Sequence, residues 1–187
     1  MLSTTRLPSP MSFACALSLT AAVALVPPGE AHAQVELEAD PIAYALNGFS
    51  LHGAKVLGAT RLSVGTFGID VPRAFHGNEG WSSTMRGAGV KWDYLGASTD
   101  GWFVGADAGY MRMSYALDLE GEAVKRNVIG VGLRSGYRLP LGRSGLYLSP
   151  WIGVSYNFHG DDVLIGTERF DRGTVTVFPT AHVGWRF

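Results

Sequence analysis

Cysteine, long apolar runs and an excess of either charge are all scarce in this chain of 187 residues. The single cysteine, Cys15, lies close to the N-terminus, so the rest of the chain can form no disulfide bond and offers no thiol for catalysis. After residue 40 no apolar stretch approaches the roughly 18 residues that indicate a transmembrane helix. Lys and Arg number 15 against 16 Asp and Glu, without a basic cluster, so nothing indicates a nucleic acid as partner.

The N-terminal segment has the organisation of a secretory signal. Arg6 is the only basic residue before the apolar segment Phe13–Val26, and the small residues of Ala31-His32-Ala33 follow. A signal peptidase recognises small residues at this spacing, so we predict cleavage before Gln34. The alternative is a membrane anchor, but the apolar segment is shorter than the roughly 20 residues that a spanning helix needs.

This prediction divides the chain into a cleaved signal, residues 1–33, and a second region, residues 34–187, with the length of a single domain. Glycine is abundant there, and the 25 glycines of the chain are scattered through segments in which apolar and polar residues alternate. Because successive side chains of a strand point to opposite faces, this alternation predicts strands with one apolar and one polar face.

The C-terminal segment, 173–187, shows the pattern most clearly, with Phe178 as the one misfit on its polar face. Its apolar face consists of Val175, Val177, Pro179, Ala181, Val183, Trp185 and Phe187. The segments predicted to be strands are 48–57, 61–71, 84–95, 101–116, 123–138, 145–158 and 173–187. Within 61–71 the alternation changes register near Thr66-Phe67, which we interpret as a β-bulge.

Most of these segments exceed the roughly 5–6 residues of an ordinary strand and reach the roughly 9–11 that cross a bilayer. Their polar faces carry Gly, Ser, Thr, Arg, Lys and Asp, so the apolar faces cannot line a small soluble barrel and must face outward, toward lipid. We therefore predict an all-β fold: a transmembrane antiparallel up-and-down β-barrel with a polar lumen.

The lengths of the connections predict the orientation and the number of strands. Short connections are expected at 57–60, 96–100 and 140–144, and longer ones at 72–83, 118–122 and 159–172. Outer-membrane barrels have short periplasmic turns and longer outer loops. With a periplasmic C-terminus, this order requires an eighth strand before residue 48, within Gln34–Leu46, although that segment contains Pro41.

The end of the chain resembles a known family. Val183, Trp185 and Phe187 form a terminal aromatic preceded by apolar residues at every second position, which resembles the C-terminal signature of bacterial outer-membrane β-barrels. Pro179 departs from it, because proline removes a strand donor. The resemblance implies a small eight-stranded, monomeric barrel in the outer membrane of a Gram-negative bacterium. Its implied partners are outer-membrane lipids, lipopolysaccharide and the barrel-assembly machinery, which would recognise this strand.

That family includes structural barrels, narrow channels and lipid-modifying enzymes, so membership does not name an activity. We expect a structural or surface-interaction role without catalytic, cofactor-binding or metal-binding residues. The charged residues expected in the lumen are Lys91, Asp93, Asp107, Arg134, Arg138 and Arg186. An eight-stranded barrel is just wide enough for side chains to fill it, which favours a plug of paired charges. The alternative is a charged constriction that selects a small solute.

A lipid-modifying enzyme is the third candidate, because it would need histidine, serine and an acid near the outer rim. The residues of these types that we considered are His52, His76, His159 and His182, with Ser82, Ser83 and Glu79. No known motif joins them. A divalent cation site in the last long loop was weighed on Asp161, Asp162, Glu168 and Asp171, but no ligand spacing supports it.

Two further patterns concern the barrel wall. Pro150 and Pro179 lie at similar heights on the last two predicted strands, so the seam between those strands is a candidate for lateral entry of a lipid chain; two tolerated bulges are the alternative. Aromatic residues near the strand ends are expected to form interfacial girdles. These residues are Trp81, Trp92, Tyr94, Trp102, Tyr137, Tyr147, Trp185 and Phe187.

Overall fold

The structure is a computed structural model that describes residues 34–118, 121, 123–159 and 162–187. The predicted signal, residues 1–33, lies outside the described residues. Within the described part of the chain, no helix has the length and apolar character needed to cross a membrane.

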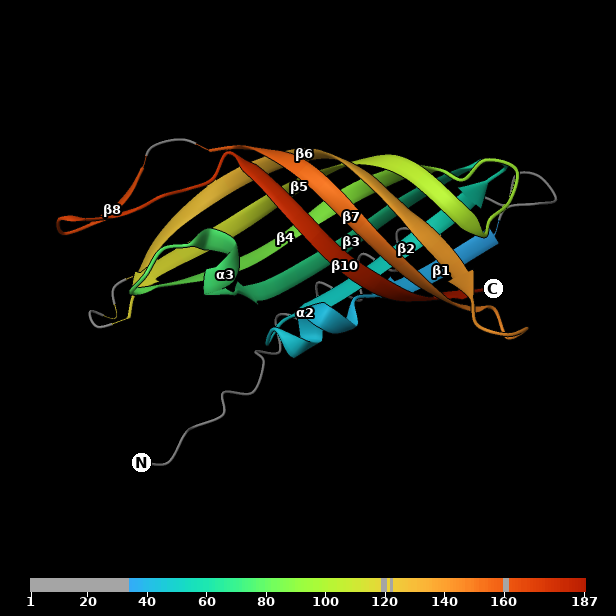
Figure 1. Ribbon diagram of the computed structural model, residues 1–187, viewed down its shortest axis with the longest axis horizontal. Coiled ribbons are helices and arrows are strands. Elements are labelled where there is room, and N and C mark those ends of the chain that lie inside the picture. The colour runs from blue at the N-terminus through green and yellow to red at the C-terminus, as the bar shows by residue number, and fades with distance from the viewer. Residues whose placement is uncertain (1–33, 119–120, 122, 160–161) are drawn as a thin grey trace, which may run out of the picture.

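Eight antiparallel strands close into a barrel in the order β1-β10-β7-β6-β5-β4-β3-β2 (Figure 1). The strands are β1 (Gln34–Ala39), β2 (Phe49–Leu57), β3 (Thr60–Val71), β4 (Trp81–Tyr94), β5 (Gly101–Leu117), β6 (Ala123–Pro140), β7 (Leu146–Phe158) and β10 (Val175–Arg186). Strands adjacent in the chain are neighbours in the sheet, and the ring closes between β1 and β10. The predicted up-and-down barrel is confirmed, and each of the seven predicted segments forms a strand.

The eighth strand is confirmed as β1, but it is shorter than the segment Gln34–Leu46 from which we expected it. Pro41 takes the first position of a short helix, α2 (Pro41–Ala45), where a missing N–H has no cost. The Asp40 carboxylate caps this helix, accepting hydrogen bonds from the backbone N–H groups of Ile42 at 2.8 Å and Ala43 at 3.4 Å. The strand therefore ends before the proline.

Because β1 is short, β10 has one incompletely paired edge. On its other side β10 pairs with β7 from Val175, opposite Tyr156, to Trp185. Its pairing with β1 begins only at Val183, opposite Ala39. Among the described residues, the part of β10 before Val183 has no strand on this edge, and α2 lies beside it, in contact with β10, β2 and β3 (Figure 1).

The predicted β-bulge near Thr66-Phe67 is wrong. The pairing of β3 with β2 and with β4 continues without an extra residue through both positions. Arg61 and Ser63 face the lumen from β3, and Phe67 and Ile69 continue on the same face. The apparent change of register is a change in the polarity of the lumen.

The seam expected at Pro150 and Pro179 is also not observed. The β7–β10 ladder runs through both prolines, with Pro150 opposite Ala181 and Pro179 opposite Ile152. The β6–β7 ladder is interrupted instead, between the pairs Gly136–Trp151 and Leu139–Leu148. Pro150 lies in that gap, because it has no N–H to donate to a neighbouring strand.

The end of the barrel opposite the short turns is covered by loop segments. These are helix α3 (Arg73–His76) and the hairpin of β8 (Val163–Ile165) and β9 (Glu168–Phe170). The hairpin contributes to a buried cluster at this end that consists of Trp81, Tyr115, Val163, Ile165 and Phe170. Asn78 joins the two segments, since its Oδ1 accepts from the N–H of Asp171 at 2.8 Å and its Nδ2 donates to the Asp171 carbonyl at 3.0 Å. We call α3, the Asn78 loop and the hairpin the cap.

The outer face of the strands is apolar and carries two groups of aromatic residues. Near the short turns, Trp92, Tyr94, Trp102, Trp185 and Phe187 are exposed, with 74% of Trp102 and 71% of Phe187 accessible. Toward the other end the exposed aromatics of the strands are Tyr110, Tyr156 and Phe158, which are not among the residues predicted to form girdles. Trp81 and Tyr147 were wrongly assigned to the outer girdles, because both are buried inside the barrel.

Candidate functional site

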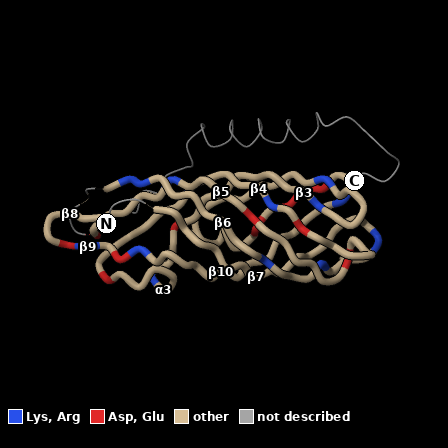
Figure 2. Tube along the Cα trace, turned by 90° about the horizontal axis from the view of Figure 1, so that it is seen from above, with Lys and Arg blue, Asp and Glu red and all other residues tan. Residues whose placement is uncertain are grey.

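The half of the lumen next to the short turns is filled by charged side chains. This lower lumen consists of Glu36, Glu38, Arg61, Asp93, Arg134, Arg138, Tyr147 and Arg186, which come from six strands. Figure 2 shows acidic and basic positions of several strands close together in the part of the barrel nearest the C-terminus.

Arg61 is the centre of the lower lumen and contacts three carboxylates. Its Nε donates to Glu36 at 2.7 Å, its Nη2 lies 2.8 Å from Glu38, and its Nη1 donates to Asp93 at 3.0 Å. Only 1% of Arg61 and none of Glu36 is exposed. Buried charges of this kind are tolerated only when each is paired, and the pairing here is extensive.

The remaining groups complete a network that crosses the barrel. Arg138 donates to Glu36 at 2.5 Å, and Arg134 donates through Nε to Asp93 at 2.8 Å. The Tyr147 hydroxyl lies 3.0 Å from Glu36 and 2.9 Å from Glu38, and can donate to one of them at a time. Because these side chains meet across the lumen, the lower half of the barrel is blocked.

The structure brings together four of the six charged residues that the sequence placed in the lumen. Asp93, Arg134 and Arg138 belong to the buried network, and Arg186 lies at its edge, 3.4 Å from Glu36 and 2.5 Å from Asp100. The other two, Lys91 and Asp107, face each other across β4 and β5 above the network. Neither forms an ion pair with any other described residue.

Sequence reasoning missed Glu36, Glu38 and Arg61. Glu36 and Glu38 alternate with the apolar residues Val35 and Leu37, so β1 does have the two-residue period of a strand. Pro41 follows closely and made the segment look unlike a strand. Arg61 alternates with Leu62 in the same way and was passed over because the segment was interpreted as irregular.

A layer of aromatic and cationic groups lies above the network. The imidazoles of His52 and His182 stack with centroids 5.2 Å apart, and His182 Nδ1 is 3.1 Å from the Glu38 carboxylate. The Lys91 ammonium is 3.4 Å from His52 Nε2 and lies 5.5 Å from the centre of the Trp151 ring. These side chains form the floor of a cavity in the other half of the barrel.

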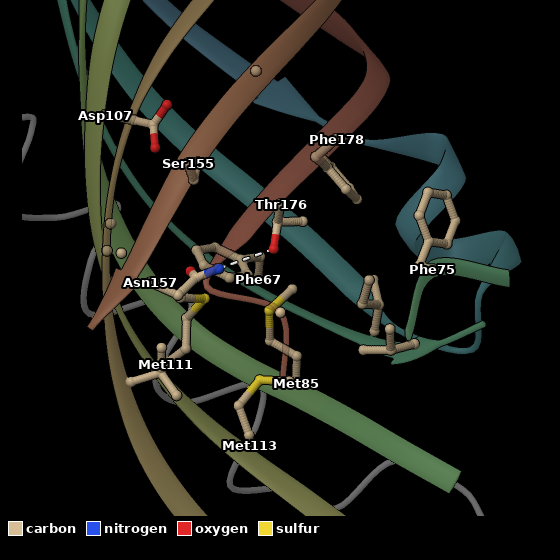
Figure 3. Close-up of a pocket in the computed structure, with 18 of the residues that line it drawn as sticks. Phe67, Phe75, Met85, Asp107, Met111, Met113, Ser155, Asn157, Thr176 and Phe178 are labelled. Carbon is tan, nitrogen blue, oxygen red and sulfur yellow. Dashed lines mark hydrogen bonds between the residues drawn. The ribbon is translucent and has the colours of Figure 1, made fainter. Parts of the chain in front are cut away.

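This upper cavity has a volume of about 480 Å³. Its side chains are mostly apolar (Figure 3), in contrast with the polar lumen that the sequence predicted. They include Phe67, Ile69, Met85, Met111, Met113, Val128 and Phe178. Polar side chains also line it: Asn157 Nδ2 donates to Thr176 Oγ1 at 2.9 Å, and Ser155 and Asp107 lie on the same wall (Figure 3). Phe178, the misfit on the last strand, thus belongs to an apolar surface.

At the end of the barrel that contains the upper cavity, the outer face of β4 to β6 changes from apolar to polar. Above the exposed Tyr110, the next outward positions on β5 and its neighbours are Arg112, Arg86 and Asn127, which pair across the strands. Beyond this row most inward positions are apolar, with Ser83 and Arg126 as exceptions, and the outward positions are largely polar. The strands therefore continue past the apolar belt with their polarity inverted.

The side chains considered for an outer-rim catalytic site are not assembled into one. Ser82 and Glu79 are exposed, whereas Ser83 is buried and faces inward. Burial, reinforced by the positive charge of Arg73, lowers the pKa of His76, whose ring packs on Phe170 with centroids 5.1 Å apart. His159 lies at the cavity edge, and its ring nitrogens have no hydrogen-bond partner in the described structure.

A serine–histidine pair does lie on the cavity floor, because Ser50 Oγ is 3.1 Å from His52 Nε2. However, His52 Nδ1 has no hydrogen-bond partner within the described residues, and Glu38 contacts His182 instead. No acid therefore orients the imidazole for general-base catalysis. Two of the four acidic residues considered for a cation site in the last long loop are Asp161 and Asp162. Asp161 lies outside the described residues, and Asp162 forms an ion pair with Arg169 at 3.1 Å.

A search against protein-family models and one against curated proteins find no match. Solved structures do match. The crystal structure of Neisserial surface protein A aligns with a TM-score of 0.50 and 14% identity over 83% of this chain and 96% of that one. A major outer membrane protein from Thermus thermophilus aligns with a TM-score of 0.50 and 14% identity over 84% and 100%. The chain has the eight-stranded β-barrel fold of small outer-membrane proteins.

Proposed function

We propose that this protein is an integral, monomeric barrel of the bacterial outer membrane with a closed lumen and a structural or surface-interaction role. The observation that carries the proposal is the buried network around Arg61, which fills the lumen next to the short turns. A channel needs a continuous polar path, and here that path ends on side chains that are almost completely buried.

The outer face supports the placement in a membrane. Apolar residues such as Val104, Leu133 and Val154 are exposed between the two aromatic groups. In water this surface would be an extensive apolar patch, whereas in a bilayer it contacts hydrocarbon and its aromatic borders lie at the two interfaces. The short turns would then face the periplasm and the cap would face the exterior.

The row above the outer aromatics supports contact with lipopolysaccharide. Arg86 and Arg112 are exposed and directly paired on the outer face, and Lys125 lies two positions farther along β6 from the partner of Arg112. Like charges in direct opposition destabilise a sheet. A lipid phosphate between them would remove the repulsion and form charge-assisted hydrogen bonds.

The two ends of the chain fit export and assembly. Val183 and Trp185 lie on the outer face of β10 and Phe187 directly follows this strand, where assembly machinery can reach them before the barrel closes. The N–H of Phe187 donates to the Val35 carbonyl at 3.0 Å. Cleavage of the signal before Gln34 would keep all described residues of β1, including the pair of Gln34 with Val56.

The experiment is fractionation of expressing cells, followed by electrophoresis with and without boiling and by conductance measurements in planar bilayers. We expect heat-modifiable migration from the outer-membrane fraction and no stable conductance. A water-soluble protein would contradict the membrane placement, and steady single-channel currents would favour the channel instead. Altered lipid A in these cells would favour the lipid-modifying enzyme, for which Ser50 and His52 are the residues to test.

A further inference from the structure

The upper cavity is too large to be explained as packing. Protein interiors leave few voids larger than a water molecule, whereas this cavity has a volume of about 480 Å³, within the range of ligand sites. The apolar part of its lining, around Met111 and Phe178, does not hold water well, so leaving that part empty costs stability. An apolar ligand of matching shape would restore the lost contacts.

The lining fits a flexible chain better than a rigid ring system. Met85, Met111 and Met113 project into the cavity (Figure 3), and methionine side chains adapt to the shape of their neighbours. Gly109 lines the same space, and a Cβ atom added there would meet nothing closer than 3.5 Å. Because Gly109 has no side chain, it leaves free space halfway along the cavity, and the methionine side chains can adapt to a ligand there.

The axial route into the cavity is closed from below, and the cap borders it above. The Arg61 network and the layer of His52, Lys91 and Trp151 lie below it. The cap lies above it, where Phe170 of the hairpin packs against Trp81 with ring centroids 5.4 Å apart. A ligand that entered along the barrel axis from below would have to displace the Arg61 network.

The side of the barrel next to α2 offers a more direct route. Among the residues that the structure describes, no strand pairs with the edge of β10 before Val183, and Val175 and Val177 on this edge are apolar and 59% and 52% exposed. Across from it, α2 exposes Ile42 and Tyr44 and turns Ala43 toward the cavity. Phe75 and Phe178 lie at this side of the cavity, 6.4 Å apart (Figure 3). The edge thus joins the outer apolar surface to the apolar interior.

We propose that the upper cavity binds one straight acyl chain, which enters sideways from the membrane between β10 and α2. The chain would lie among Phe67, Met111 and Phe178 with its methyl end toward Trp151. This inference rests on the proposed membrane placement. The same hydrocarbon chain is carried by lipids and by free fatty acids, and the experiment below has a separate arm for each source.

The lipid arm uses Trp151 as a reporter. Trp81, Trp92, Trp102 and Trp185 are replaced by Phe, and the refolded barrel is placed in phosphatidylcholine vesicles that contain a lipid brominated near its chain ends. We expect quenching of Trp151 that is lost with Gly109→Phe, because the new ring fills the cavity. Quenching should persist with Ala88→Phe, which adds the same ring on the exposed outer face of the neighbouring strand.

A second reporter keeps Trp92 alone, because this side chain is exposed on the outer apolar face. If brominated lipid fails to quench Trp92, the membrane placement itself is wrong. If Trp92 is quenched but Trp151 responds equally in the Gly109→Phe and Ala88→Phe backgrounds, lipid chains do not enter the cavity.

The fatty-acid arm uses the protein with all of its tryptophans, which avoids any loss of stability from replacing buried Trp81. Stearate carrying a nitroxide near its methyl end is added to the barrel in detergent, and its mobility is followed by electron paramagnetic resonance. An immobilised signal that Gly109→Phe removes and Ala88→Phe retains would support the site, with fatty acid as its source. Failure of both arms in a correctly folded, heat-modifiable barrel would overturn the inference.

Discussion

The two halves of the lumen use opposite chemistry on the same strands. The lower lumen is filled by ion pairs around Arg61, whereas the upper cavity is lined largely by apolar side chains, methionine and phenylalanine among them. On β3 the change occurs within a few residues, between Ser63 and Phe67. Directional interactions hold the lower half, whereas the upper half depends on contact area. Substitutions in the two halves should therefore have different consequences.

The largest effect is expected from Arg61→Met. The substitution preserves bulk but leaves Glu36, Glu38 and Asp93 without their shared cation, and breaking a buried ion pair on one side costs about 3–5 kcal/mol. The unfolding free energy in urea, followed by heat-modifiable migration, measures this loss. Arg143→Ala in an exposed turn is the control and should leave the unfolding free energy unchanged. A fully stable Arg61→Met barrel would show that the network does not hold the lower lumen.

Tyr147→Phe should have the second largest effect. The variant removes one hydroxyl that lies within hydrogen-bonding distance of Glu36 and Glu38, and a hydrogen bond to a charged group contributes about 1.5–3 kcal/mol. The same urea titration measures it. Combined with Arg61→Met, the two losses should not add, because both side chains act on the same carboxylates. Additive losses would mean that the network is a set of independent pairs.

Asp40→Ala tests the border between the halves. Its carboxylate caps α2 and accepts a hydrogen bond from Thr180 Oγ1 at 2.6 Å, which ties the helix to β10. Loss of the cap alone costs about 1 kcal/mol. We expect faster hydrogen exchange at the backbone N–H groups of Ile42 and Ala43, with little change in the lower lumen. Unchanged exchange in α2 would show that the helix is held by other contacts.

Asn78→Ala should have the smallest effect on global stability. The side chain makes two hydrogen bonds to the Asp171 backbone in the cap, each contributing about 1 kcal/mol. Limited proteolysis of intact cells or vesicles should cleave the loop beside β9 faster in the variant. The unfolding midpoint of the barrel should stay close to the original value. A large shift of that midpoint would mean that cap and barrel unfold as one unit.

The sequence was sufficient to predict the architecture because strand alternation and connection length are local properties. It also placed Asp93, Arg134 and Arg138 in the lumen, since their faces follow from period two. The prediction from the sequence was wrong where it assumed that the inward face of a strand is polar over its whole length. Phe178 and Phe67 look like errors in a polar face, but they line an apolar cavity on that face.

Contacts between residues that are far apart in the sequence could not be predicted from strand alternation or connection length. The partner of Arg61 is Glu36 on a strand of only six residues, and nothing local indicates that such a strand closes the ring. The position of α2 is likewise set by Asp40 and Thr180, which are 140 residues apart. Such contacts depend on the closed barrel.

The Arg61 network also bears on how the barrel forms. Glu36 meets Arg138 and Tyr147, which lie 102 and 111 residues farther along the chain. A growing sheet that lacks β1 cannot make these bonds, and without β10 no ring holds β1 close to β7; contacts so distant in sequence also form slowly. Insertion of the final strand would therefore create the ring and neutralise its interior in a single late event, so an unfinished barrel would remain distinguishable from a finished one.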